Sequence, residues 1–464
     1  MKSKLKGMVM GLLSCCLSLS LAVAQRGVDG YKGIWFTLGQ FSAYGDKYSG
    51  GLGTYTAKHI PMAVYAKEVD KTFFVYGGTR DSTERKLLCM IGCFDHRTGR
   101  VAKPVVVYDK GDVGDPHDNP TIAMDEQGYI WVFVSGRGTG RPGILFKSRN
   151  RHAIDGFDEV MRGEFTYPQP KYIQNKGFLH LFTKYSGLRE LYFNTSRDGK
   201  NWSEVAKLAG IKRGGDTLSG HYQISGQYGD KVAFFFNWHP NGDVDRRTNI
   251  YYLETEDFGR TWQTANGQRM AIPVNEVASK ALVKDYFTTE NNVYIKDVSF
   301  DGDGNPIALY LVGDGHQPGP DNGVKEWRVT YWDGTVWRDH KVAESDHNYD
   351  MGSLFVDGGK WQVVIPSGQP PQAWAGGGEV VIWKSKNEGK SWKLAKKVTS
   401  HSRYNHNYIR KVVNGRAPFE YFWADGDPNQ LSKSELYFGD LKGNVWKLPY
   451  HMDQPWEKPM KRKK

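Results

Sequence analysis

Histidine and tyrosine side chains recur at wide intervals along this chain of 464 residues, each just before an extended apolar stretch. Imidazole and phenol groups hydrogen-bond polar ligands and can exchange protons. If the starts of these stretches meet in space, the side chains would ring the mouth of one central funnel that binds a ligand. They are His59, His117, Tyr167, His221, Tyr294, His347 and His406.

The stretches behind these residues indicate short β-strands that must position them. Each stretch leads into a turn rich in Asp, Asn or Gly, and the starts recur roughly every 50 to 70 residues. Apolar and aromatic runs between the turns predict further strands. Among them are Tyr129–Ser135, Phe178–Lys184, Val232–Trp238, Ile307–Val312 and Trp361–Pro366.

A second repeat marks tight turns of the form Ser-x-Asp-x-Gly-x-Thr-Trp, the Asp box. Residues 255–262 match it in full length, 196–202 match a shorter form, and 385–392 carry Asn387 in place of the aspartate. Weaker copies end in Trp337 and Trp446. The acid caps the turn, the glycine takes a positive φ, and the tryptophan packs beneath. These roles are structural, so we expect no catalysis from the turns.

These repeats predict an all-β fold. Seven units of about four short strands predict a seven-bladed β-propeller of four-stranded blades, and a pair of sandwiches is the alternative. No linker marks a second domain, so residues 25–464 are expected to form one domain with a basic tail at 458–464. Residues 27–58 are expected to close the ring against the C-terminal strands.

Composition and charge exclude several classes of protein. The 14% aromatic residues and 54 glycines are untypical of a disordered chain. Eight of the 62 basic residues lie in the two end segments, and their removal leaves 54 basic against 51 acidic residues. The net charge of +11 therefore describes mostly the ends, and a nucleic-acid partner is not expected.

The beginning of the chain predicts export. Residues 1–24 combine a lysine-bearing start, an apolar stretch and an Ala-Val-Ala site, which is typical of a signal peptide cleaved after Ala24. A lipoprotein site at Cys15 is the alternative. We expect a periplasmic or secreted protein that is not an integral membrane protein. Cys89 and Cys93 remain after cleavage, and their spacing on one strand predicts buried thiols without a disulfide.

Several segments resemble a known family. They are His-Asp-Asn-Pro at 117–120, Tyr-Pro-Gln-Pro at 167–170, Asn-Trp-His-Pro at 237–240 and Asp-Gly-Asp-Gly-Asn-Pro at 301–306. Together they resemble the Asp-box (bacterial neuraminidase repeat) propellers that include ulvan lyases and α-L-rhamnosidases. The opening segment at 33–51 looks most like the rhamnosidase branch. The arginine triad of a sialidase is missing from the sequence.

The rhamnosidase resemblance implies a glycoside hydrolase that releases L-rhamnose linked α-1,4 to D-glucuronic acid at the ends of complex glycans. That branch relies on one catalytic histidine in the opening segment. Gln40 stands at the matching position and His59 is a second candidate. Glutamine hydrogen-bonds sugars but does not exchange protons at neutral pH. The hypothesis is therefore an exported α-L-rhamnosidase, active or with lost activity.

The lyase resemblance implies a different chemistry, β-elimination at a uronic acid. His117 and Tyr167 match the acid and base positions of the ulvan lyases, and Lys184 falls near their neutralising arginine. Arg137 takes the place of a second histidine, where it would bind a carboxylate. A lyase is the first alternative function, and a non-catalytic glycan-binding propeller is the second.

Further residues are candidates for binding a uronate-containing oligosaccharide or polysaccharide. Arg247 and its neighbour Arg246 would recognise carboxylates or be surface charges. His316 lies in a Gly- and Pro-rich loop. The sequence implies no cofactor and no metal in the site, and leaves a structural cation such as calcium open. The predicted substrate-binding set is His59, Arg137, Lys184, His221, His239, Tyr294, His347 and His406.

Overall fold

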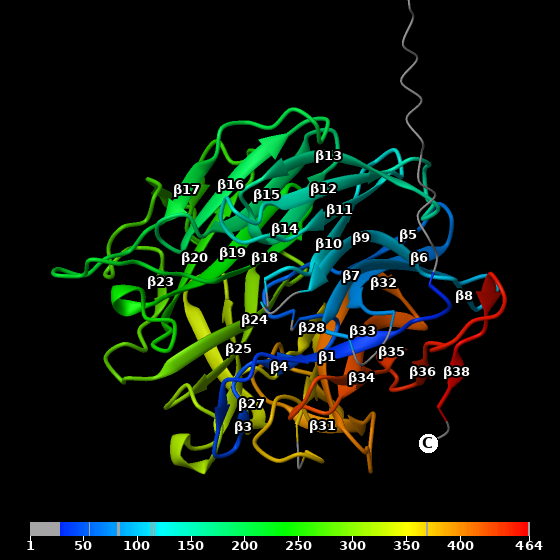
Figure 1. Cartoon of the computed structure of the whole chain (residues 1–464). Helices are drawn as coiled ribbons and strands as arrows, with labels where there is room; N and C mark the ends of the chain where they lie inside the picture. Colours follow the sequence, from blue (N-terminus) through cyan, green and yellow to red (C-terminus); the bar gives the residue numbers. More distant parts are fainter. Residues whose placement is uncertain are drawn as a thin grey trace, which may run out of the picture.

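Antiparallel sheets that follow one another along the chain make up this computed structural model (Figure 1). It describes residues 28–462 except 55, 81–83, 113–114, 116 and 368–369. The predicted signal peptide and the last two residues of the basic tail lie outside the described residues. Within the described part of the chain, no helix is long and apolar enough to span a membrane.

The middle of the chain forms separate sheets, most of them four-stranded. The first two are β10–β13 (Pro120–Met124, Ile130–Val134, Gly143–Ser148, Phe157–Gly163) and β14–β17 (Thr166–Ile173, Gly177–Lys184, Glu190–Ser196, Ala206–Ala209). The next is β18–β23 (Gln223–Tyr228, Lys231–Trp238, Thr248–Thr255, Trp262–Gln263, Arg269–Met270, Leu282–Lys284). The last two are β24–β27 (Asn292–Phe300, Pro306–Gly313, Lys325–Trp332, Trp337–Ser345) and β28–β31 (Ser353–Asp357, Lys360–Pro366, Val380–Ser385, Lys393–Lys397).

The two ends of the chain share one larger sheet. Its first half is β5–β9 (Ala63–Ala66, Lys71–Gly78, Lys86–Asp95, Arg100–Ala102, Val105–Asp112). Its second half is β32, β33, β35, β36 and β38 (Asn405–Arg416, Phe419–Gly426, Leu436–Gly439, Val445–Lys447, Met460–Lys461). A parallel pairing of β5 with β32, at Val64 and Val413, joins the halves.

Each end of the chain also pairs with strands from the other end. β1 (Gly33–Thr37) pairs with β34 (Ser432–Ser434), β4 (Ser49–Gly50) and β6, and β37 (Trp456–Glu457) pairs with β8. The expectation that residues 27–58 close the structure against C-terminal strands is confirmed. The remaining elements are the hairpin β2–β3 (Phe41–Ser42, Gly45–Asp46) and the 3-10 turns η1 (Pro240–Gly242) and η2 (Pro320–Asn322).

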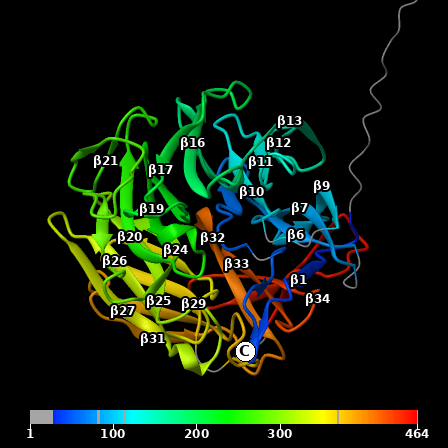
Figure 2. The same ribbon diagram turned by 60° about the vertical axis from the view of Figure 1, so that its left-hand side comes forward.

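The first strand of each sheet packs against the first strand of the next. Figure 2 shows the sheets succeeding one another around a common centre, from blue through green and yellow to orange. This radial arrangement is that of a β-propeller. The first strands in contact order are β5, β10, β14, β18, β24, β28 and β32, which returns to β5.

The core lies between neighbouring sheets. Because both faces of a sheet are covered, strands such as β11 and β20 are buried along their whole length instead of alternating between buried and exposed residues. Cys89 and Cys93 lie buried in β7 as free thiols, as the sequence predicts.

The Asp-box turns have the structural role that we expected. Each connects the third and fourth strands of its sheet, and the Asp257 carboxylate accepts hydrogen bonds from the Thr261 amide at 2.9 Å and hydroxyl at 2.7 Å. In the first copy the Trp202 indole donates to the Gly199 carbonyl at 3.0 Å. These turns lie at the opposite ends of the strands from the residues that begin each first strand.

Candidate functional site

The histidines and tyrosines that recur along the sequence do stand at or near the starts of the first strands, but they are buried. The His221 ring faces the Asn237 carbonyl at 2.9 Å and accepts from the Ile211 amide at 3.0 Å. His406 accepts from the Trp423 indole at 3.0 Å and meets the Ser402 hydroxyl at 2.9 Å.

His347 accepts from the Tyr349 amide at 3.0 Å. Burial lowers the pKa of His221 to about 4 and the pKa of both His347 and His406 to about 3. In the structure these three histidines are therefore neutral, buried side chains that bond within the protein. Their role in binding a substrate stays a prediction.

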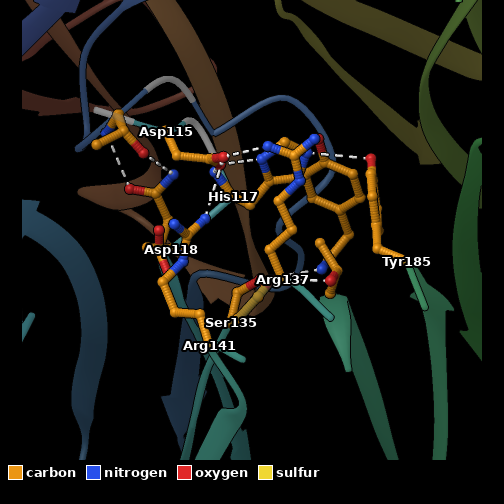
Figure 3. Close-up of polar contacts among 12 residues, drawn as sticks. Asp115, His117, Asp118, Ser135, Arg137, Arg141 and Tyr185 are labelled. Atoms are coloured by element: carbon orange, nitrogen blue, oxygen red, sulfur yellow. Dashed lines mark hydrogen bonds and ion pairs between the residues drawn. The ribbon is translucent and has the colours of Figure 1, made fainter. Parts of the chain in front are cut away.

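One group of proton-exchanging side chains is continuous, and it is built around His117. The Nε2 atom of His117 lies 3.0 Å from the Tyr185 hydroxyl, and its Nδ1 atom is hydrogen-bonded to the Asp115 carboxylate. Arg137 and Arg141 bind the other carboxylate oxygen of Asp115, at 2.6 and 3.1 Å (Figure 3). Because an ionised carboxylate can only accept, Nδ1 carries the proton and Nε2 accepts from Tyr185.

The electrostatics of this group favour a neutral imidazole beside an ionised carboxylate. Burial lowers the pKa of His117 below its usual 6.5, although the hydrogen bond from Asp115 partly opposes this. Burial alone would raise the pKa of Asp115, but its bonds to His117 and its arginine neighbours lower it far below its usual value. A neutral imidazole held in this orientation, with its Nε2 lone pair towards the Tyr185 hydroxyl, is in the protonation state that a general base needs.

Three tyrosine hydroxyls continue the group. Tyr185 lies 3.2 Å from Tyr222, and both are hydrogen-bonded to Tyr167. Burial would raise the pKa of Tyr222, but nearby guanidinium charges outweigh it and the pKa falls below 10. The pKa of Tyr185 is raised well above 10, chiefly by burial. The cluster therefore contains phenols of different acidity within hydrogen-bonding reach of an imidazole.

Backbone geometry and a buried histidine set the position of Tyr167. Tyr167 has a φ of 54° and lies in a bulge of β14, where the register shifts between Thr166 and Gln169. Such a bulge re-aims a side chain. His59 packs edge-on against its ring at 5.1 Å and bonds to the His117 carbonyl at 3.0 Å. Burial lowers the pKa of His59 to about 3, so it supports the cluster as a neutral ring.

Arginines surround the tyrosines. Arg137 lies 5.4 Å from the centre of the Tyr185 ring, while Arg189 and Arg247 lie 5.3 and 4.8 Å from the Tyr222 ring. Guanidinium groups bind carboxylates through two parallel hydrogen bonds, so the site is suited to an acidic sugar. Arg137, which the sequence predicts to bind a carboxylate, shares the partner Asp115 with His117 in the structure.

Two residues that were predicted to bind substrate, Lys184 and His239, bond to other side chains in the structure. Lys184 is paired with Glu164 at 3.3 Å, whereas Arg189 lies 5.3 Å from the Tyr222 ring. His239 is fully buried, meets Arg189 through Nδ1 at 2.8 Å and packs edge-on against Tyr222. Its contact in the structure is with Arg189.

Gln40 lies in a different pocket. It is exposed and lines a cavity of about 250 Å³ together with Lys47, Asp245, His316 and other residues of the two surrounding loops. Lys47 and His316 both pair with Asp245. Tyr294 lies deeper, with its ring 4.7 Å from Arg247.

Sequence reasoning did not select Asp115, Tyr185, Tyr222 or Arg189. Tyr185 and Arg189 lie in the loop between the second and third strands of their sheet, and Tyr222 lies directly before a first strand. In a propeller both positions lie at the same face. Searching the loops between second and third strands for polar residues would have found two of them. Among the described residues, no three His, Cys, Asp or Glu side chains are grouped to hold a metal ion.

A comparison with protein families matches the model for BNR repeat-containing family members over residues 91–345, more than half of the chain. The chain belongs to this family. The BNR-repeat protein is also similar to curated ulvan lyases. It is 23% identical over 346 residues to an ulvan lyase of Alteromonas sp. (strain LOR), which covers 66% of this chain and 68% of that enzyme.

A second relative is an ulvan lyase of Pseudoalteromonas sp. (strain PLSV), 22% identical over 286 residues. That match covers 53% of this chain and 58% of the relative. A third relative, an ulvan lyase of Nonlabens ulvanivorans, is 25% identical, and the match covers 54% of that enzyme. The BNR-repeat protein thus spans roughly half to two thirds of the curated relatives it matches.

A solved ulvan lyase bound to a -[GlcA(1-4)Rha3S]- fragment superposes with a TM-score of 0.70 at 16% identity, covering 89% of this chain and 96% of that one. This match shows the shared all-β propeller fold. The expectation of an α-L-rhamnosidase, and of a glycoside hydrolase in general, is wrong: the three curated relatives and the solved structure with a TM-score of 0.70 are ulvan lyases. Gln40 accordingly loses its assignment as the site of a missing catalytic histidine.

Proposed function

We propose that this protein is an exported polysaccharide lyase that cleaves a uronate-containing polysaccharide of the ulvan type by β-elimination. The observation that carries the proposal is the His117–Tyr185 hydrogen bond, held by Asp115 on one side and surrounded by arginines. The likeness to ulvan lyases supports it.

β-Elimination needs three things from the protein. The uronate charge must be neutralised so that the hydrogen on C5 becomes acidic, a base must remove that proton, and an acid must protonate the departing oxygen on C4. We assign the first role to Arg137 and Arg189, because both flank the tyrosine cluster and can take a carboxylate in a fork. Nε2 of His117 is the base and the Tyr185 hydroxyl is the acid.

The proton transfers balance between His117 and Tyr185. The C5–H bond breaks and its proton goes to Nε2, the C4–O bond breaks as the C4–C5 double bond forms, and the Tyr185 proton goes to the departing oxygen. The protonated imidazole then returns its proton to the tyrosinate across their 3.0 Å contact. Asp115 stabilises the transient imidazolium, and Tyr167 and Tyr222 stabilise the transient tyrosinate by hydrogen bonding.

We also infer that the ring of sheets is a seven-bladed propeller. The closed series of first strands supports this count, if the two halves of the large sheet are taken as separate blades. In such a ring, the starts of first strands and the loops between second and third strands meet at one face. Asp115, His117, Arg137, Tyr185, Arg189 and Tyr222 all fall in these positions.

The test is incubation of the purified protein with ulvan, following the ultraviolet absorbance of the unsaturated uronate that elimination creates. Tyr185→Phe and His117→Asn should each lower kcat by roughly 10²- to 10⁴-fold, the usual contribution of a positioned acid or base. Tyr228→Phe is the matched control, because Tyr228 is 44% exposed at the end of β18, on the opposite face. The proposal fails if the native protein forms no unsaturated product, or if His117→Asn retains full activity.

A further inference from the structure

Three cationic side chains are buried near the axis of the ring, beneath the tyrosine cluster. Lys58, Arg247 and Lys296 are 5%, 3% and 1% exposed. None of them forms an ion pair with a carboxylate of the described residues. Buried charges in folded proteins are almost always paired, because an unpaired one loses its hydration without compensation. Such a cluster therefore requires an explanation.

The three cations share the same aromatic walls. Arg247 lies 4.8, 4.7 and 5.3 Å from the ring centres of Tyr222, Tyr294 and Tyr349. The Lys58 ammonium lies 6.0 Å from the first of these rings. The Lys296 ammonium lies 5.4 and 5.8 Å from the other two. The three positive charges therefore lie against the same group of tyrosine rings.

The protein supplies only neutral acceptors to these cations. Lys58 donates to the Ile295 carbonyl at 2.7 Å and Lys296 to the Asn348 carbonyl at 2.5 Å. Arg247 donates to the Val244 carbonyl at 2.8 Å and to the Tyr349 hydroxyl at 2.5 Å. These bonds satisfy donors but leave the net charge uncompensated.

Asp350 is a carboxylate close enough to interact with Lys296, but it is committed elsewhere. It accepts from the Ser345 hydroxyl and from the Gly377 amide, each at 2.6 Å. Burial raises its pKa well above the usual value, which favours its neutral form. Its carboxyl group is held by these two donors and forms no ion pair with Lys296.

A polar group within the cluster is also unpaired. The Tyr294 hydroxyl is buried and has no hydrogen-bond partner among the described residues. A donor without an acceptor in the interior destabilises the fold, because it has lost its hydration without compensation. The cluster thus contains a free hydroxyl donor beside three cations. These are the groups that bind an anion.

Deprotonation of the two lysines would remove only part of the uncompensated positive charge. Burial and the neighbouring positive charges lower the pKa values of Lys58 and Lys296 well below 10.5, so the lysines can shed their charge. Arg247 stays protonated, because its pKa is raised well above 12.5: burial lowers it, but Tyr349, Tyr294 and other phenols outweigh this. Arg247 therefore keeps a buried charge without a carboxylate partner among the described residues, and Arg410, another buried arginine, adds its positive charge to Lys58 and Lys296.

We propose that Lys58, Arg247 and Lys296 form a binding site for a small oxyanion, with Tyr294 as an additional donor. The oxyanion is either a free ion such as sulfate or an acidic group carried by a sugar. Tyr222 borders both this site and the His117 cluster, so the anion lies at the floor of the candidate active site. The site does not depend on the proposed lyase reaction, because its occupancy is measured by stability.

The experiment measures the thermal unfolding of the native protein against increasing sodium sulfate, sodium glucuronate or glucose, with sodium chloride holding the ionic strength constant. Lys296→Met and Lys58→Met each remove one cation at nearly constant volume. Lys390→Met is the control, since Lys390 is exposed and contacts only Glu388 at the surface. A ligand that binds the folded state alone raises the unfolding temperature in a saturable way.

We expect an anion to raise the unfolding temperature of the native protein and of Lys390→Met, with no effect of glucose. The apparent affinity should fall at least tenfold in Lys296→Met or in Lys58→Met, whichever folds. A response to sulfate alone identifies a free ion, and a response to glucuronate identifies a group carried by a sugar. The proposal is overturned if neither anion acts, or if both lysine variants respond like the control.

Discussion

His180 offers a sharp test of how burial controls charge in this fold, because its partners are almost all aromatic. It lies in β15, is 3% exposed and packs against Phe133, Phe165, Phe182 and Trp202 at ring distances of 4.8 to 5.8 Å. Burial lowers its pKa to about 3. The unfolded chain keeps a pKa of about 6.5 at this residue, so the unfolded state binds the proton first as the pH falls.

The sign and size of the effect follow from this difference. A histidine whose pKa is lowered in the folded state does not change the free energy of unfolding at a pH well above 6.5. As the pH drops from there towards the folded-state pKa, it lowers the free energy of unfolding increasingly. Between pH 7.5 and 5.5, pKa values of about 6.5 unfolded and about 3 folded give a loss of about 1.4 kcal/mol of unfolding free energy. His180→Phe removes this loss while keeping an aromatic ring in the cluster.

The assay is denaturant unfolding of the native protein and of His180→Phe at both pH values. All other titrating groups are common to the two proteins, so their contributions cancel in the difference. The native protein should lose about 1.4 kcal/mol more than the variant over this interval. Parallel losses in the two proteins would show that His180 does not stay neutral in the folded state, and the reasoning would be refuted.

Two further predictions concern the site and the turns. Asp115→Asn removes a hydrogen bond that raises the pKa of His117, so the acid limb of kcat/KM on ulvan should move to lower pH while kcat falls by roughly 10²-fold or more; an unchanged profile would contradict the assigned role. Gly199→Ala places a Cβ 2.4 Å from the Trp131 ring at a φ of +72° and should cost about 1–3 kcal/mol in denaturant unfolding. Gly229→Ala, with positive φ but open space, should cost less, and equal losses would show that the contact is unimportant.

The sequence predicted the repeating architecture because each repeat is built from local signals. An Asp box needs only its own few residues to form, and the Asp257 turn has the hydrogen bonds that its sequence implies. The start of each first strand could be located in the same way. His117 and Tyr167 were selected as functional residues on this basis, and their rings lie 5.1 Å apart.

The remaining members of the site depend on contacts between sheets, which no local pattern encodes. Tyr185 meets His117 across 68 positions of the chain, and Arg189 owes its place to His239, 50 positions away. For the same reason the sequence could not separate His117 from His406. Both open a first strand, but one meets a tyrosine hydroxyl near the surface and the other is enclosed by Trp423 and Ser402.

The exchange of strands between the two ends has a consequence for biosynthesis. β1 needs Ser432–Ser434 as its partner, and β8 is completed by Trp456 and Glu457. The first blade to emerge from the ribosome therefore lacks an edge until nearly the whole chain has been made. These strand pairings cannot form until translation is nearly complete. An exported chain would therefore cross the membrane before its ring closes. Folding of the finished ring then depends on joining segments more than 350 residues apart.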